Sequence, residues 1–177
     1  MAGPKGRLLS TAPSISVAVS GAGLPGNSRA RKALRPGQVA ARAAVRAAQL
    51  GAPDDARAWL RPFWDRLSEL TREDREDVAL AFIAASPGVG GDWLPRLESA
   101  LVAYGQEPAV VAAVGSAYAQ RQLWGQARRL LEQAAAAPTL PARARRAAWR
   151  HLASLARQEA DEPRAVLCER AAAEIDP

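Results

Sequence analysis

The chain has 177 residues, 49% of them hydrophobic, which suits one folded domain with a tail. The single cysteine, Cys168, excludes an intrachain disulfide, and with the single histidine, His151, it leaves too few ligands for a Cys/His zinc cluster within one chain. The formal net charge of +6 is carried by residues 1–36, which hold six basic residues and no acid, because residues 37–177 hold 18 basic and 18 acidic residues.

Residues 1–36 are rich in Gly, Pro and Ser and lack helical periodicity, which predicts a disordered basic tail. Two other interpretations are weaker. The apolar stretch after Lys5 and Arg7 has the rough form of a secretory signal, but Pro13 and several serines interrupt it. Residues Gly21 to Gly26 formally match G-x-G-x-x-G, yet Pro25 lies inside the match and position 46 is Arg where a dinucleotide site needs an acid.

From residue 37 onward the pattern predicts successive helices and no strand. Gly and Pro clusters separate them, and Thr71 with Asp74 predicts a capping box at the start of the third helix. The chain holds no apolar run of 18 residues, so no transmembrane helix is predicted. The expected helices cover 38–50, 54–70, 72–85, 92–104, 108–121, 124–137, 142–159 and 163–175.

Small residues recur in a frame of about 34 residues. With repeats started at Gly37, Asp74, Pro108 and Arg146, the eighth, twentieth and twenty-seventh positions give twelve slots, of which ten hold Ala or Gly. Short side chains at helical spacing favour a close approach of two antiparallel helices in each repeat. The slots are Ala44, Ala81, Gly115 and Ala153; Ala56, Trp93, Ala127 and Ala165; Phe63, Ala100, Ala134 and Ala172.

This pattern resembles the tetratricopeptide repeat, which implies an all-α solenoid of helical hairpins with about four repeats, near 37–70, 74–107, 108–141 and 146–177. The segment from Gln120 to Glu132, which contains Gln-Leu-Trp-Gly-Gln-Ala-Arg, is similar to the C-terminal repeat region of the HemY family. HemY proteins are proteobacterial membrane-anchored tetratricopeptide proteins associated with heme biosynthesis. The family's two transmembrane helices and preceding repeats have no counterpart here, so we expect a cytoplasmic location for this chain.

A stack of such repeats places the first helix of each hairpin along a concave groove. The second, fifth, ninth, twelfth and thirteenth positions then supply the polar or bulky groove residues Gln38, Gln49, Arg75, Val78, Phe82, Ser116, Gln120, Arg150, Ser154, Arg157 and Gln158. Of these we predict partner binding by Arg75, Phe82, Ser116, Gln120, Arg150, Ser154 and Arg157. Arg143 and Arg146 extend the arginine stripe, which suits carboxylates of a peptide or a porphyrin, although a solvated helix face explains the same residues.

We find no pattern typical of catalysis and predict a non-enzyme without cofactor or metal. Heme ligation by His151 or Cys168 is the alternative, but Glu169 follows Cys168 where heme-regulatory motifs have proline.

The expected function is a protein-interaction scaffold that binds a protein or peptide in the groove, with heme-biosynthesis enzymes as the candidate partners. A generic adaptor with an unrelated partner, and nucleic-acid binding through the basic tail, stay open as alternatives, although no specific nucleic acid is expected. The open ends of the stack also predict weak self-association.

Overall fold

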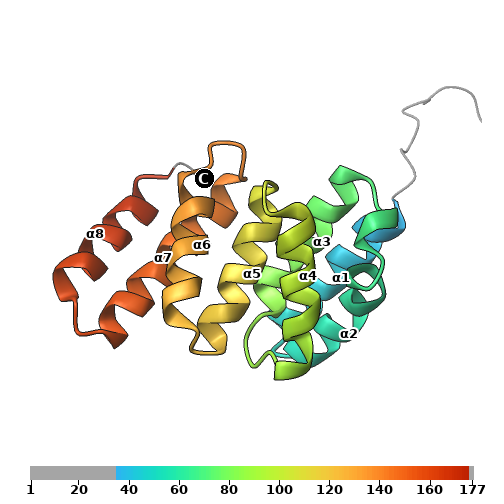
Figure 1. Cartoon of the computed structure of the whole chain (residues 1–177), viewed down its shortest axis with the longest axis horizontal. Helices are drawn as coiled ribbons and strands as arrows, with labels where there is room; N and C mark the ends of the chain where they lie inside the picture. Colours follow the sequence, from blue (N-terminus) through green and yellow to red (C-terminus); the bar gives the residue numbers. More distant parts are fainter. Residues whose placement is uncertain (1–34, 176–177) are drawn as a thin grey trace, which may run out of the picture. The chain divides into compact units, whose positions relative to one another are not determined.

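The structure, a computed structural model, describes residues 35–175, and every regular element in that range is helical (Figure 1). The predicted eight helices are confirmed there. They are α1 (Pro36–Gln49), α2 (Pro53–Trp64), α3 (Arg72–Ala85), α4 (Leu94–Tyr104), α5 (Pro108–Gln120), α6 (Trp124–Ala136), α7 (Ala142–Gln158) and α8 (Glu162–Ala173), with short 3-10 turns η1 (Leu67–Glu69) and η2 (Gly91–Trp93).

Two element boundaries differ from the sequence-based expectation. Helix α2 ends at Trp64, not near residue 70, because Pro62 removes a backbone donor from its last turn and the chain leaves the helical conformation at Arg66, where φ is −130°. The C-terminal boundary of the predicted tail, residues 1–36, lies earlier in the chain than expected. Pro36 opens α1, and Arg35 pairs with Glu73 at 2.6 Å; residues 1–34 lie outside the described part.

The start of α3 confirms the predicted cap. The Thr71 hydroxyl oxygen accepts the backbone N–H of Asp74 at 3.2 Å and donates to the Asp74 carboxylate at 2.9 Å. The first contact satisfies a backbone N–H that would otherwise lack a partner at the helix start. It is the N-cap half of the predicted capping box, and the Asp74 carboxylate bonds the Thr71 hydroxyl in place of the Thr71 N–H.

The helices pack in a regular order along the described chain. The odd-numbered helices form a row in which α1 packs on α3, α3 on α5 and α5 on α7. Helix α2 packs on α1 and α3, α4 on α5, α6 on α5 and α7, and α8 on α7. Apart from α3 and α4, helices neighbouring in sequence are therefore neighbours in space, as expected where each hairpin buries its apolar face against the next.

The predicted small-residue slots lie where helices meet. Eleven of the twelve are buried, and the exception, Phe63, is half-buried. Gly115 on α5 shows the reason for small size, because a Cβ added there would lie 3.1 Å from the Leu130 Cβ and 3.1 Å from the Leu131 Cγ on α6. Helices α5 and α6 can approach this closely only because position 115 has no side chain.

The second hairpin departs from this close packing. Trp93 occupies a slot that holds Ala in the other three repeats, and its ring packs on Phe82 with centroids 4.9 Å apart, while Phe82 packs on Trp64 at 5.0 Å. The backbones of α3 and α4 consequently do not make the close approach that α5 and α6 make. Three aromatic side chains fill the space between α2, α3 and η2 instead.

Ion pairs join neighbouring hairpins at a nearly constant separation. Two of them, Arg96–Asp65 and Arg128–Glu159, join residues 31 positions apart, and Arg75–Glu107 and Arg164–Glu132 join residues 32 apart. Partly exposed pairs of this kind add little stability singly. In each of these pairs, one whole helix lies between the two residues along the chain.

Candidate functional site

Two predicted binding residues lie in the core. The Phe82 side chain is 0% exposed within the aromatic cluster, and Ser116 is 1% exposed on α5. The prediction that these side chains line an open groove is therefore wrong. Phe82 stabilises packing between α2, α3 and η2, and the Ser116 hydroxyl has a partner inside the protein.

Arg75 is also used internally. Its guanidinium pairs with Glu107 at 2.6 Å, donates to the Leu70 carbonyl at 2.7 Å and lies 4.4 Å from the centre of the Tyr104 ring. The hydrogen bond to Glu107 raises the pKa of Arg75 above its already high usual value. Arg75 therefore ties α3 to the α4–α5 connection and is not available to a partner, contrary to the prediction.

The other four predicted residues are exposed. Gln120 lies at the end of α5, and Arg150, Ser154 and Arg157 lie on α7. Arg157 pairs with Glu169 on α8. None of the seven predicted residues lines the groove that the structure shows.

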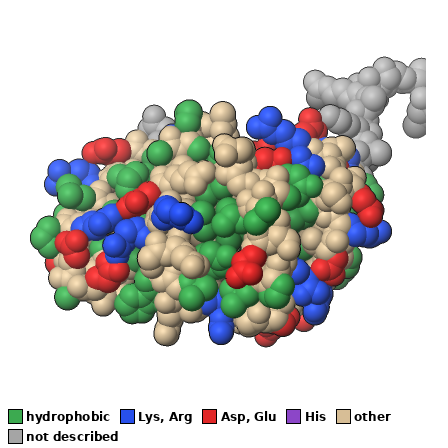
Figure 2. Space-filling view, in the orientation of Figure 1, with side chains coloured by type: hydrophobic (Ala, Val, Ile, Leu, Met, Phe, Trp, Pro, Cys, Tyr) green, Lys and Arg blue, Asp and Glu red, His purple; other side chains and the backbone are tan. Residues whose placement is uncertain are grey.

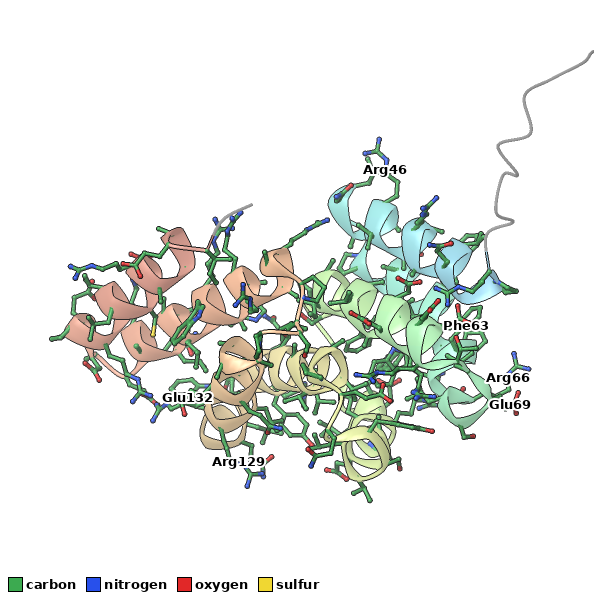
Figure 3. All side chains as sticks on the ribbon, turned by 90° about the horizontal axis from the view of Figure 1, so that it is seen from above. Arg46, Phe63, Arg66, Glu69, Arg129 and Glu132 are labelled. Atoms are coloured by element: carbon green, nitrogen blue, oxygen red, sulfur yellow. The ribbon has the colours of Figure 1, made fainter. Side chains whose placement is uncertain are left out.

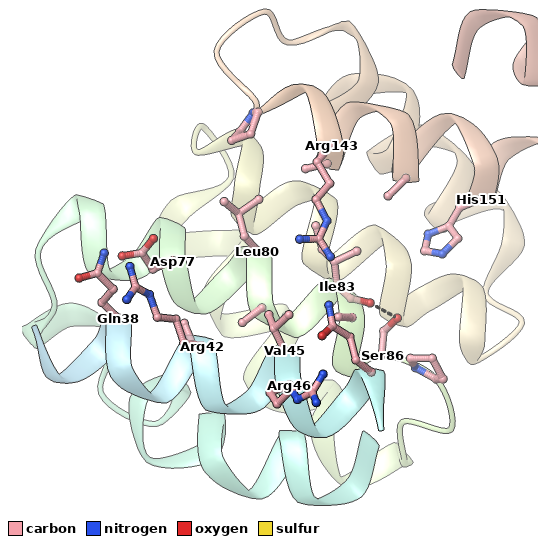
Figure 4. A pocket seen from close by; sticks show the side chains of 18 residues that line it. Gln38, Arg42, Val45, Arg46, Asp77, Leu80, Ile83, Ser86, Arg143 and His151 are labelled. Carbon is pink, nitrogen blue, oxygen red and sulfur yellow. Dashed lines mark hydrogen bonds between the residues drawn. The ribbon is translucent and has the colours of Figure 1, made fainter. Parts of the chain in front are cut away.

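That groove lies between α1, α3 and α7 and has a volume of about 700 Å³ (Figure 4). Its floor is apolar, with Val45 from α1, Leu80 and Ile83 from α3, and alanines from all three helices. Its rim is polar. The lining residues are Gln38, Ala41, Arg42, Val45, Arg46, Gln49, Asp77, Leu80, Ala81, Ile83, Ala84, Ser86, Pro87, Pro141, Arg143, Ala144, Ala147 and His151.

The charged side chains of the groove are mostly basic. Arg42 and Arg46 rise from α1, and Arg143 reaches from α7 toward α1 above the apolar floor (Figure 4). None of these three arginines forms an ion pair with another residue of the described range 35–175. The groove's acid, Asp77, is already paired with Arg35 at 2.9 Å. The groove is therefore suited to anionic groups.

His151 forms the polar end of the groove on α7. Its Nδ1 lies 3.1 Å from the Ser116 Oγ, and burial lowers the pKa of the imidazole below its usual 6.5. The ring is therefore neutral at pH 7 and adds no charge to the three arginines. The buried Ser116 hydroxyl holds the ring in place but is not open to a substrate.

Sequence reasoning found part of this groove. Gln38, Gln49 and Arg143 were singled out from the repeat pattern and all line it. On α3 the predicted face was wrong, because the groove residues Asp77 and Leu80 each follow a predicted position, Arg75 and Val78, by two. Two residues turn a helix by about 200°, so Val78 points into the core and Arg75 toward Glu107.

Arg42 and Arg46, which reasoning from repeat positions missed, have one usable signal. They lie one helical turn apart on α1, and each is two residues from the buried Ala44, a spacing that places them on the opposite, outward side of the helix. No group of three or more metal-ligating side chains lies together among residues 35–175, and none of the described helices is both long and apolar enough to cross a membrane.

These observations define a class: an all-helical protein with hairpins packed in sequence order and a basic, apolar-floored groove across three of its helices. Comparison with known protein families, with curated proteins and with solved structures found no match to this chain.

Proposed function

We propose that this protein is a non-catalytic scaffold that binds a segment of a partner protein in the groove of α1, α3 and α7. The proposal rests on the groove itself, which is built from helices of three different hairpins. It combines an apolar floor with arginines that have no ion-pair partner in the described part of the chain. Such a surface offers both buried apolar area and directional polar contacts to a peptide.

A tetratricopeptide-type stack of about four repeats is the architecture that we propose for the folded part. The row of odd-numbered helices, the buried small-residue slots and the ion pairs spaced by 31 and 32 residues support it. The weakest support comes from α3 and α4, where Trp93 replaces a small residue.

The structure lends less support to the resemblance to the HemY family than to the repeat architecture. Within the Gln120–Glu132 segment, Ala127 and Leu131 are 0% exposed, so their presence follows from packing alone. The similarity thus supports a repeat fold more than a role in heme biosynthesis. We retain heme-biosynthesis enzymes as the partners to test first, and a generic adaptor with another partner as the alternative.

The groove proposal is tested by affinity purification with the full chain from a proteobacterial extract. Leu80→Glu combined with Ala147→Glu places acids in the groove. The matched control, Val102→Glu with Leu167→Glu, adds the same charge at exposed sites on α4 and α8. We expect the groove variant to lose a protein that wild type and control both retain, with equal helicity by circular dichroism.

Equal recovery by groove variant and wild type would place the binding surface elsewhere. Recovery of heme-biosynthesis enzymes by wild type and control alone would support the narrower HemY-type role, and recovery of other proteins with the same dependence would support a generic adaptor.

Self-association is a separate proposal for the first hairpin. Val39 on α1 and Trp59 on α2 are 48% and 56% exposed beside Pro62 and Phe63, around a hollow of about 760 Å³. An exposed Trp in such a hollow is a typical interface residue. Sedimentation equilibrium of wild type should show weak, concentration-dependent dimerisation that Trp59→Lys removes and Val102→Lys keeps; a strictly monomeric wild type would contradict it.

A further inference from the structure

The basic side chains of the groove are spaced in a way that matches one form of peptide. Arg42 and Arg46 are four residues apart on α1, which corresponds to a rise of about 6 Å along the helix. In an extended chain, residues i and i+2 lie on the same side and are separated by about 6.6 Å. Two acids placed at i and i+2 can therefore face both arginines at once.

The two glutamines of α1 indicate the axis along which such a segment would lie and the length that the groove can hold. Gln38 and Gln49 lie at opposite ends of the groove stripe, 11 residues apart, or about 16 Å. A side-chain amide offers a donor and an acceptor together, which matches the N–H and C=O of a peptide bond. The distance between them spans about five residues of extended chain.

The floor and the opposite rim complete the fit. Side chains that alternate with the acids would point to Val45, Leu80 and Ile83, which form the apolar floor. Arg143 on α7 faces the same space from the other side (Figure 4), so a carboxylate in the groove can be approached from two helices. Because these arginines have no acid partner among residues 35–175, no internal ion pair there competes with such a contact.

Nucleic acid fits this groove less well than a peptide. No Trp, Tyr or Phe lines it, whereas single-stranded nucleic acid is bound by stacking of bases on aromatic rings. Figure 2 draws another face, on the side of α4 and α6, where acidic and basic side chains are interspersed and form no broad basic track for a phosphate backbone.

We propose that the groove binds an extended segment of a partner protein in which acidic residues alternate with apolar ones, with Arg42, Arg46 and Arg143 receiving the carboxylates. This inference rests on the proposed scaffold function and specifies the chemistry of its partner. Free anions carry the same charge but lack the apolar side chains and the spacing, so the pattern of the peptide is the property to test.

The probe is a fluorescein-labelled peptide that alternates Glu and Leu between Gly-Ser flanks, titrated with the full chain by fluorescence anisotropy. A second peptide of the same composition places the Glu and Leu residues in separate blocks, and a third replaces Glu with Lys. We expect binding of the alternating peptide only, with an affinity that falls as salt rises.

The variant Arg42→Gln, Arg46→Gln, Arg143→Gln should weaken this binding by at least about tenfold, since it removes three charge-assisted contacts. The matched control, Arg121→Gln, Arg129→Gln, Arg170→Gln, removes the same charge from exposed arginines outside the groove; Arg129, for example, points away from the other helices (Figure 3). The control should bind as wild type does.

The inference is overturned if the groove variant binds as tightly as wild type, if the block or Lys peptide binds equally well, or if single-stranded oligonucleotide displaces the alternating peptide. Failure of the broader proposal has a different signature. A groove that binds a partner of other chemistry would still lose it in the Leu80→Glu, Ala147→Glu purification, whereas a groove that binds nothing would show no effect in either experiment.

Discussion

Gly115 leaves little room for a side chain at the contact of α5 and α6, because a Cβ would lie 3.1 Å from both Leu130 and Leu131. Gly115→Leu should therefore lower the free energy of unfolding by about 1–3 kcal/mol, since α5 and α6 must separate. Arg129→Ala, at an exposed site of α6, should change it by less than about 0.5 kcal/mol. Urea denaturation monitored by circular dichroism compares the two, and equal effects would refute this packing.

Two non-glycine residues hold the left-handed conformation where helices end. Gln122 after α5 and Ala160 after α7 both have φ of 59°, the role that Gly51 fills after α1 at φ 81°. A side chain there is strained, and glycine is not. Ala160→Gly should thus stabilise the protein by about 1 kcal/mol. Glu159→Gly, at φ −90°, should destabilise it; a loss of stability in Ala160→Gly would contradict this account.

His151 makes stability depend on pH. Burial lowers the pKa of His151 in the folded state below its usual 6.5, so the unfolded chain binds the proton more readily. The stability due to the neutral ring is complete above pH 6.5 and is lost as pH falls toward the lower folded pKa. Denaturation midpoints between pH 7.5 and about pH 5 should fall further for wild type than for His151→Gln. Parallel curves would show that His151 carries no such linkage.

At the scale of elements, a buried arginine connects α2 to the end of α3. Arg57 is 5% exposed and donates to the Ala85 carbonyl at 2.5 Å and the Pro87 carbonyl at 2.6 Å, and it pairs with Asp54. Arg57→Met would leave these carbonyls without a donor and should cost about 3 kcal/mol. Arg61→Met, one turn later and exposed, is the control. Equal denaturation midpoints would show that the α3–η2 loop holds its shape without Arg57.

The helices could be predicted from the sequence because Gly and Pro clusters mark their ends and the small residues mark their closest contacts. Gly115 and Ala127 are examples, since their burial follows from helical spacing alone. The groove face of α3 could not be predicted in the same way. A helix contacted on several sides has no polar face to fix its orientation, and Phe82 and Leu80 are both large and apolar, although only Phe82 is fully buried.

The arginines of the groove were even harder to predict from the sequence than the groove face of α3. The repeat frame supplies positions, but the rotation of each helix depends on the neighbours against which it packs. Arg42 is exposed on α1 because Ala41 and Ala44 turn inward, and Arg143 reaches the same groove from a hairpin about 100 residues away in sequence. The helices and their close contacts can therefore be predicted from residues near one another in the sequence. The charge of the groove depends on how helices distant in sequence pack together.

For the molecule as a whole, the proposed function requires that a partner binds in the groove. Site-specific photocross-linking tests this directly, with a benzophenone amino acid at Gln49, which lines the groove, or at Val102, which is 90% exposed on α4. The account predicts that the full chain in a cell extract forms an adduct with one defined protein from position 49, that the Leu80→Glu, Ala147→Glu variant loses it, and that position 102 does not form it. The same adduct from position 102, with none from position 49, would show that the partner does not bind in the groove.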